Sequence, residues 1–537
     1  MFTAKMRWAF IALVLLGAIL RLCIAWSPME WLLRHVLCDD SFYYLTIART
    51  LARRGVCSFD GTTLTNGFHP LWLALITPLF WIQCIPTQSV HLVLTLCALC
   101  DIFALVLLAR LLRFLNMSAE SVLVVVALYA LSPGLFSYTG ALNGMDTSLN
   151  TAVLCALLTS YMAIQLKLPL RIASPAAFGM LCGFSFLART DSGIIAAVLL
   201  ISVLVTQRGG IRFALATMIA AIAIVTPWLY WNMSTFGTVL QVSGEAYAFA
   251  TRELTGAANW GIMEYGARAV KNLADVFRFF PETLGLETKY SVGYAAQSLA
   301  CASACCAAAY TVYRKAGAPA ELIRTRMRLL AGPLLASTAF VLVHSVKSIN
   351  LRGWYYATAL PPLWVALAAL VDMGFSRHSR RLIRFFSLLP VILALLLGIW
   401  SVSEDAFHHD GEIEKFLAID RMRHLLPPEA KVGSWNAGVY GYFYDMGQIV
   451  DLDGLVNNAV FPYIRHRSLG TYCVNNHIEF LVDAPGTFKV WDSFWAQAPG
   501  GLLRSITPVG PMSDRELKAP ILIAQIVSPF IPQPIPP

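Results

Sequence analysis

Two adjacent carboxylates, Asp39 and Asp40, open the first polar segment of the chain, directly after its first long apolar run. Aromatic residues follow at once in Phe42, Tyr43 and Tyr44. An Asp here is a candidate general base for an acceptor hydroxyl. It is equally well explained as the N-cap of a following helix, because a carboxylate accepts from the free N–H groups of a first turn. Capping accounts for one acid and leaves the second unexplained.

The same polar segment continues into a turn rich in glycine and asparagine, at residues 65–70. Asn66 and His69 are candidates for hydrogen bonds to a sugar or a phosphate, and ordinary turn chemistry is the simpler interpretation. Cys38 and Cys57 flank the acidic pair and could form a disulfide if the segment lies outside the cytoplasm. The sequence leaves that pairing open.

Asp146 is a second candidate acid, at the start of a later apolar run. It is either the N-cap of the next helix or a carboxylate that faces the first polar segment. Asp39 and Asp146 together could hold a divalent cation such as Mg²⁺ or Mn²⁺, with phosphate oxygens and water as the remaining ligands.

Basic residues at the ends of apolar runs are the candidates for phosphate binding. Arg352 is followed by Trp354, Tyr355 and Tyr356, and His344 and Lys347 lie just before it. A guanidinium makes two-point contacts to phosphate, so Arg352, Lys347 and Tyr355 are predicted to contact one. Arg189 is a further candidate. The alternative for these arginines is that they extend along apolar surface toward water.

Membrane-spanning helices must position these residues. The 537-residue chain is 57% hydrophobic and only 13% charged, whereas soluble domains carry about 25% charged residues. Apolar runs of about 20 residues recur from residue 10 to residue 400, which is the length a helix needs to cross a bilayer. The sequence therefore predicts an all-α polytopic membrane protein. Its net charge of +9 is explained by basic cytoplasmic loops rather than by a nucleic-acid partner.

The distribution of basic residues predicts the topology. Lys5 and Arg7 place the N-terminus in the cytoplasm, before an uncleaved first helix. Residues 71–85 contain Pro78, and we expect them to dip into the membrane or lie on it, because a full crossing would put the later basic loops outside. About eleven spans result, with long external segments at 28–68 and 232–290. The later spans are predicted at 90–112, 119–137, 148–166, 174–189, 193–206, 211–230, 292–313, 329–346, 354–373 and 385–403.

The last part of the chain changes character. Residues 1–403 form the predicted membrane domain, and residues 404–537 a small extracytoplasmic α/β domain with a proline-rich end. The predicted elements are a helix at 412–426, an aromatic helix or turn at 437–444, and strands at 431–435, 448–452 and 477–482. The chain has no phosphate-binding lysine loop or other nucleotide-hydrolysis motif, so we expect any energy source to come with the substrate.

These features together resemble the GT-C superfamily of integral membrane glycosyltransferases. The segments Asp39–Tyr44, Phe59–Gly61 and Thr65–Trp72 carry the resemblance, with Asp146 and Arg352–Tyr356 as weaker matches. The chain looks most like bacterial relatives of protein O-mannosyltransferases and lipid A aminoarabinose transferases.

The resemblance implies inverting transfer of a sugar from a polyprenyl-phosphate donor to a glycan, lipid or protein acceptor outside the cytoplasmic membrane. By the same resemblance Asp39 is the base, and Asp146 matches an acid that helps to bind a metal in some members. We expect Asp40 to orient the base or to cap the helix. Arg352 matches a basic position near the lipid phosphate. His69 departs from the family, which often has a basic residue there, so the phosphate contacts of this turn are in doubt.

Two other classes remain open from the sequence. A transporter or lipid flippase would carry buried charges in the middle of its spans, and Asp101 is the acid nearest to such a position. A membrane scaffold would bind its partners through residues 404–537. Consumption of a donor lipid would separate the first class from both.

Overall fold

The structure is a computed structural model that describes residues 3–131, 140–206, 210–283, 320–349, 353–375, 410–495, 503–509 and 521–526. The chain divides into two compact units. The first contains residues 1–27, 94–227 and 261–407, and the second contains residues 28–93, 228–260 and 408–537. The predicted boundary at residues 403 and 404 stays a prediction.

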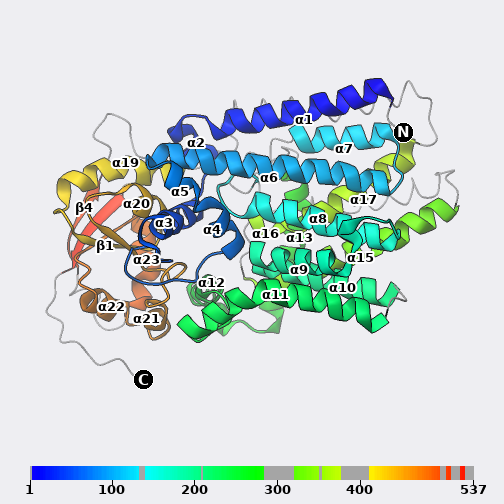
Figure 1. The fold of residues 1–537 in the computed structure, drawn as a ribbon. Coiled ribbons are helices and arrows are strands. Elements are labelled where there is room, and N and C mark those ends of the chain that lie inside the picture. Colours follow the sequence, from blue (N-terminus) through cyan, green and yellow to red (C-terminus); the bar gives the residue numbers. More distant parts are fainter. Residues whose placement is uncertain are drawn as a thin grey trace. The chain divides into compact units, whose positions relative to one another are not determined.

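The first unit is helical in the residues described (Figure 1). Two further helices, α6 (Pro86–Phe114) and α11 (Gly210–Phe236), have residues in both units. The helices of the first unit are α1 (Ala4–Ala25), α7 (Ala119–Leu131), α8 (Thr147–Gln165), α9 (Pro175–Ala188), α10 (Gly193–Thr206), α13 (Ile262–Thr283), α15 (Ala320–Lys347), α16 (Gly353–Ala357) and α17 (Leu360–Phe375).

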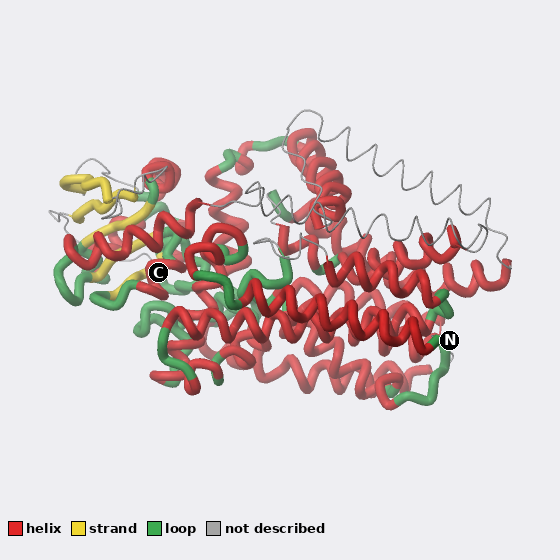
Figure 2. The backbone as a smooth tube through the Cα atoms, turned by 90° about the horizontal axis from the view of Figure 1, so that it is seen from above, coloured by secondary structure: helices red, strands yellow, loops and turns green. Residues whose placement is uncertain are grey.

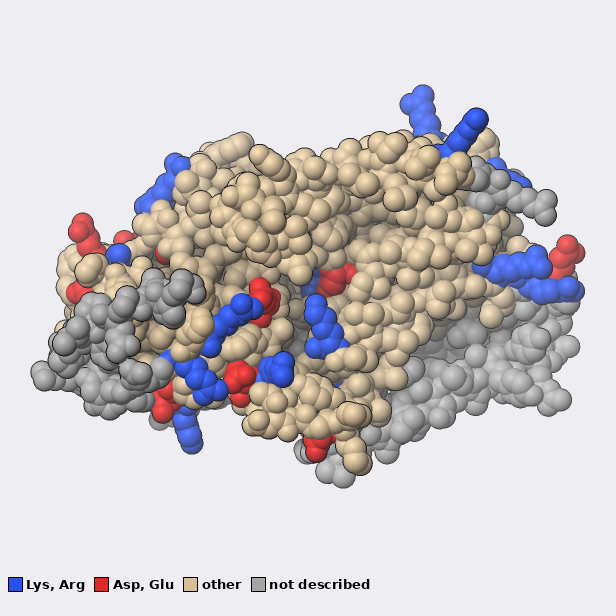
Figure 3. All heavy atoms as spheres, turned by 90° about the horizontal axis from the view of Figure 1, so that it is seen from below, with Lys and Arg blue, Asp and Glu red and all other residues tan. Residues whose placement is uncertain are grey.

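Among the described residues, five helices are long and apolar enough to cross a membrane: α1, α6, α8, residues 211–236 of α11 and residues 324–347 of α15. Wide areas of the described surface on the face in Figure 3 carry neither basic nor acidic side chains, as expected for surface in contact with lipid. The chain is therefore a multi-pass helical membrane protein. The number of eleven spans stays a prediction, and the predicted spans at 292–313 and 385–403 lie outside the described residues.

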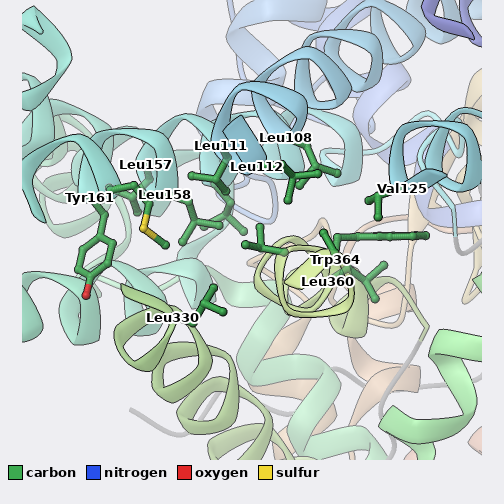
Figure 4. Packing of buried hydrophobic residues seen from close by; sticks show 14 of the residues in the cluster. Leu108, Leu111, Leu112, Val125, Leu157, Leu158, Tyr161, Leu330, Leu360 and Trp364 are labelled. Atoms are coloured by element: carbon green, nitrogen blue, oxygen red, sulfur yellow. The ribbon is translucent and has the colours of Figure 1, made fainter. Parts of the chain in front are cut away.

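The core of the first unit is packed from leucines and aromatic residues of several helices (Figure 4). Leu108 and Leu112 of α6, Leu157 of α8 and Trp364 of α17 are all nearly inaccessible to solvent. Trp364 lies at an angle to Tyr129 of α7, with ring centroids 5.6 Å apart. This close packing fixes the ends of the helices, where the candidate polar residues lie.

A buried ion pair joins α1 and α6 inside the first unit. Arg21 Nε lies 2.6 Å from Asp101 Oδ2, and the Tyr129 hydroxyl donates to Asp101 Oδ1 at 2.7 Å. Arg21 also donates to the carbonyl oxygens of Gly17 and Ala130. These contacts satisfy both charges, as a buried pair requires. They give Asp101, the acid to which the transporter alternative pointed, a structural role.

The second unit combines short helices with a sheet, whose strands gather in one region of Figure 2. Its helices are α2 (Met29–His35), α3 (Asp39–Arg54), α4 (Pro70–Ile76), α5 (Leu79–Ile82), α12 (Val242–Leu254), α19 (Asp410–Leu425), α20 (Gly438–Phe443), α21 (Phe461–Arg465), α22 (Leu469–Asn475) and α23 (Pro485–Trp491). The segment 232–290, which the sequence predicted only as a long external loop, contains α12 of this unit and α13 of the first unit.

The predicted helix after the acidic pair is confirmed as α3. Cys38 is its N-cap, and the Ser41 hydroxyl accepts from the Cys38 N–H at 3.4 Å. Gly55 ends the helix in the left-handed conformation, with φ 73°, which glycine adopts without strain. The apolar run that follows breaks at Pro78 into α4 and α5, of seven and four residues. Both are far shorter than a span, in keeping with the prediction that this run does not cross.

The sheet has the order β2-β1-β3-β5-β4. Strands β1 (Lys431–Ser434), β2 (Gln448–Asp451) and β3 (Phe480–Asp483) are parallel, and β5 (Ile521–Ile526) and β4 (Leu503–Val509) add antiparallel to its edge. The first three strands, with α19 and α20, confirm the elements predicted from the sequence. The last two strands were not predicted.

Candidate functional site

Asp39 lies in the first turn of α3, but its carboxylate does not cap that helix. Its Oδ1 accepts from Lys415 Nζ at 2.7 Å and from the Val439 N–H at 3.2 Å, and its Oδ2 accepts from the Gly438 N–H at 3.0 Å. The two N–H groups begin α20, so Asp39 stabilises the start of a helix almost 400 residues further along the chain. The side chain is buried, with 8% of the residue exposed.

Lys415 of α19 is the cation of this pair. Burial favours its neutral form, but the negative charges of Asp39 and Glu412 outweigh burial and raise the pKa of Lys415. Glu412 also accepts from the Asp39 N–H, at 3.1 Å. The ammonium therefore stays charged, and both oxygens of Asp39 are engaged by donors.

Asp40 is more exposed than Asp39 and lies near a second acidic group of the same unit. The Tyr43 hydroxyl donates to Asp453 Oδ2 at 3.5 Å. Burial, followed by the charge of Asp451 and with a smaller contribution from Asp40, raises the pKa of Asp453 well above its usual range. The raised pKa favours the protonated form of Asp453, and the charge of Asp40 acts in the same direction as burial.

Asp451 and Asp453 form a pair that the sequence analysis missed. Asp451 ends β2, and its carboxylate accepts from the N–H groups of Gly454 and Val456 at 3.1 and 3.2 Å. Burial raises the pKa of Asp451 to about 6, although the hydrogen bonds from Asp453 and the backbone act in the opposite direction. The available signal was an Asp-Leu-Asp-Gly sequence after a predicted strand, because loops at the carboxyl ends of parallel strands often hold functional groups.

The predicted turn around Asn66 connects three segments of the second unit. Asn66 Nδ2 donates to Asn232 Oδ1 at 3.2 Å, and Asn66 Oδ1 accepts from Asn458 Nδ2 at 2.9 Å. A Cβ on Gly67 would lie 1.9 Å from the carbonyl oxygen of Leu455, so only glycine fits there. These contacts favour the simpler interpretation of Asn66, as a structural residue.

His69 belongs to the same unit as Asp39 and Asp40. Its Nδ1 shares a hydrogen bond of 2.6 Å with the hydroxyl of Tyr44, on α3. The proposed contact of His69 with a sugar or phosphate stays a prediction. Cys38 and Cys57, which flank the acidic pair, are both free thiols in the structure.

The first unit brings three other candidates, Asp146, His344 and Tyr355, together around Arg189, with Asp191 beside them. Arg189 Nη1 lies 3.2 Å from Asp146 Oδ2, and its Nε lies 3.0 Å from Asp191 Oδ1. His344 Nε2 is 3.3 Å from Asp191 Oδ2, and the guanidinium lies over the ring of Tyr355 at 4.6 Å. Asp146 occupies the N-cap position of α8, but its carboxylate makes no capping hydrogen bond to the first turn. It pairs with Arg189 instead.

The remaining candidates are less well defined. Lys347 is exposed at the end of α15. Arg352, the predicted phosphate contact, lies outside the described residues. Asp39 and Asp40 belong to the second unit, and Asp146 and Arg189 belong to the first.

The described residues do not form a site ready to bind the divalent cation that the sequence predicted. Asp39 and Asp146 each form an ion pair with a basic side chain. The described part of the chain contains no group of three His, Cys, Asp or Glu residues that could hold a metal ion. A metal would have to displace Lys415 or Arg189, and no step proposed below depends on one.

The fold is that of the GT-C glycosyltransferases, as the resemblance implied. ArnT from Cupriavidus metallidurans in the apo state aligns with a TM-score of 0.58 and 14% identity, over 97% of this chain and 98% of that chain. The same protein bound to undecaprenyl phosphate gives a TM-score of 0.56 and 14% identity, over 96% and 97%. The Archaeoglobus fulgidus oligosaccharyltransferase, tethered with an acceptor peptide, gives 0.53 and 13% identity, over 95% and 75%.

A family model described as a domain of unknown function (DUF8728) matches residues 404–511. No curated protein matches the sequence. The comparisons therefore define the fold of the whole chain and leave its substrates to be inferred.

Proposed function

We propose that the protein is a glycosyltransferase that moves a sugar from a polyprenyl-phosphate donor to an acceptor outside the cytoplasmic membrane, with inversion. The observation that carries this proposal is the GT-C fold over nearly the whole chain, together with an acidic pair at the start of α3. One solved structure with this fold binds undecaprenyl phosphate. In such a donor the polyprenyl phosphate leaves as the acceptor attacks the sugar, so no nucleotide is needed. This agrees with the absence of a nucleotide-binding motif from the sequence.

Within the acidic pair we assign the base to Asp40 and a positioning role to Asp39. The resemblance implied the reverse. The reason for the exchange is that Lys415 and two N–H groups already engage both oxygens of Asp39, and hydrogen bonds to a carboxylate stabilise its charged form. Asp40 is the more exposed acid and follows directly in the same helical turn. It would take the proton of the acceptor hydroxyl as that oxygen attacks the sugar.

For the donor phosphate, Arg352 and Lys347 stay the predicted contacts. Arg189 is engaged by Asp146 and Asp191, so we assign it to the positioning of those acids. Localisation to the inner membrane, with a cytoplasmic N-terminus and an external C-terminal domain, is part of the proposal and follows from the basic loops.

The test uses the purified full-length chain and a panel of undecaprenyl-phosphate-linked sugars, with release of undecaprenyl phosphate as the measurement. Asp40→Asn should lower transfer about 100-fold or more, the range for loss of a general base, while thermal stability stays close to that of the wild type. Asp39→Asn should lower both stability and transfer. Asp492→Asn, an exposed acid of the same unit, is the matched control and should change neither.

Full activity of Asp40→Asn would refute the assignment of the base. Failure to consume any donor in the panel, with a folded protein, would favour a transporter or scaffold. Consumption of the donor by Asp40→Asn but not by a folded Asp39→Asn would return the role of base to Asp39.

A further inference from the structure

The second unit contains a cavity of about 690 Å³ that the proposed chemistry does not use. Its walls come from the second half of α3, the turn around Asp60, the first residues of α6, one side of α19, and the segment from α20 to β2. This volume is in the range of cavities that bind small molecules. Asp39 and Asp40 do not line it.

Four arginines line the cavity, and two of them are committed to the fold. Arg423 forms ion pairs with Asp420 and Asp445, at 2.7 and 2.9 Å. Arg49 donates to the carbonyl oxygens of Tyr442 and Gly441, at 2.7 and 2.9 Å, and lies over the Tyr442 ring.

Arg53 and Arg54 are different. Each donates one hydrogen bond to a main-chain carbonyl, of Cys84 at 3.5 Å and of Gly61 at 3.3 Å respectively. Neither forms an ion pair with any residue that the structure describes. Asp60, the nearest acid in sequence among the lining residues, instead accepts at one oxygen from Ser58, Thr62 and Thr63. A guanidinium has five N–H donors, so most of the donors of Arg53 and Arg54 remain for a ligand.

An apolar edge adjoins these arginines. Ile85 lines the cavity and directly precedes α6, which is one of the candidate spans. Trp81 and Ile82 of α5 are 68% and 79% exposed. The Trp81 indole donates to the carbonyl of Ala52 at 3.0 Å, which places this apolar edge beside the residue that precedes Arg53. Basic residues next to exposed apolar side chains at the end of a span are the pattern that anionic lipids recognise.

We propose that this cavity binds the phosphate headgroup of an anionic membrane lipid. Arg53 and Arg54 contact the phosphate, and the acyl chains lie along Trp81, Ile82 and Ile85. Guanidinium groups suit this role because they contact two phosphate oxygens at once. The site is independent of the transfer reaction, since it shares no residue with the acidic pair.

The test measures binding of dioctanoyl phosphatidylglycerol to the purified full-length protein, with dioctanoyl phosphatidylcholine and inorganic phosphate as comparison ligands. The wild type should prefer the glycerol lipid to both. Arg53→Gln/Arg54→Gln should weaken its binding about 25-fold, because each basic residue near an anionic headgroup contributes roughly fivefold. Both side chains are exposed, so the variant should unfold at the wild-type temperature.

Arg252→Gln/Lys489→Gln is the matched control, because it removes two exposed positive charges from the same unit outside the cavity. It should leave the preference unchanged. Undiminished lipid binding by Arg53→Gln/Arg54→Gln, or an equal loss in the control, would overturn the site. Equal affinity of the wild type for inorganic phosphate would overturn the lipid as its ligand. None of these readouts requires sugar transfer, so the outcome does not depend on the proposed function.

Discussion

The two units handle their buried acids in different ways. In the first unit one cation, Arg189, serves two acids, Asp146 and Asp191, and also stacks on Tyr355. In the second unit one cation, Lys415, forms an ion pair with Asp39, whose carboxylate also accepts from two backbone N–H groups at the start of α20. Arg189 therefore connects two acids to each other, whereas Asp39 is bound by Lys415 and by the first N–H groups of α20.

This difference shows why a carboxylate at the start of an apolar run is a poor guide to its role. Both Asp39 and Asp146 fit the pattern of a helix cap, yet neither caps the helix that it precedes or begins. In each case a basic side chain distant in sequence is the principal partner. Substitutions of these partners test the comparison.

The largest effect is expected for Arg189→Met. It leaves Asp146 and Asp191 without their shared cation, and loss of one partner of a buried pair costs about 3–5 kcal/mol. We expect the upper end of that range in the free energy of unfolding, measured by denaturant titration in detergent. Arg189→Lys should recover only part of it, because a lysine cannot make the two-point contact. A fully stable Arg189→Met would show that the network is not structural.

Lys415→Met should destabilise the protein less, by about 3 kcal/mol, because two N–H groups still stabilise the Asp39 charge. The double variant Lys415→Met/Asp39→Asn should recover part of the loss, since it removes the uncompensated charge. Equal stability of the single and double variants would contradict the pairing. The same titration in detergent measures both.

Asp451 and Asp453 extend the comparison to acids that form no ion pair with any described basic side chain. Burial raises the pKa of Asp451 to about 6 and raises the pKa of Asp453 well above its usual range. A raised folded-state pKa of an acid favours its protonated form, so this pair stabilises the fold most below about pH 4 and loses that stabilisation as pH rises through about 6 and above.

Asp453→Asn keeps a donor to Asp451 but cannot lose a proton. The difference in unfolding temperature, variant minus wild type, should therefore increase between pH 5 and pH 7.5. A constant or decreasing difference would contradict the raised pKa of Asp453. Asp492→Asn, which is exposed, should show no such trend.

The smallest effect is expected at a neutral hydrogen bond. Tyr44→Phe removes the hydroxyl that lies 2.6 Å from His69 Nδ1 and should cost about 1 kcal/mol, the net value of such a bond. Thermal unfolding of the variant measures it. A loss as large as that of Lys415→Met would show that the turn at His69, and not the ion pair, dominates the stability of the second unit.

The sequence predicted the helices and the first three strands because hydrophobic runs and their breaks are local signals. Gly55 ends α3, and Pro78 separates α4 from α5. It could not predict that Asn66 bonds to Asn232 and Asn458, because such contacts depend on which distant segments meet. The strands β4 and β5 were missed for a related reason, since β5 pairs with β3 and with β4, and such pairings also depend on which segments meet.

The candidate acids were found from their types and positions, but their partners were not. Lys415 was hidden in a predicted amphipathic helix with nothing local to mark it as buried. Asp451 ends the short strand β2 and Asp453 lies just after it. Their raised pKa values arise mainly from burial, which cannot be read from a sequence. Arg189 was singled out at the end of a span, and its two acids were found beside it.

The ion pair between Asp39 and Lys415 also implies an order of events during synthesis of the chain. The two residues are 376 positions apart, so a ribosome adding about 5–20 residues per second delivers the acid roughly 20–75 s before its cation. During that interval α3 exists without the helix that Asp39 caps and without the sheet of the second unit. Completion of the second unit is therefore a late event in synthesis. A chain that stops before residue 415 has the contacts of Asn66 with Asn232 but lacks the cation that pairs with Asp39.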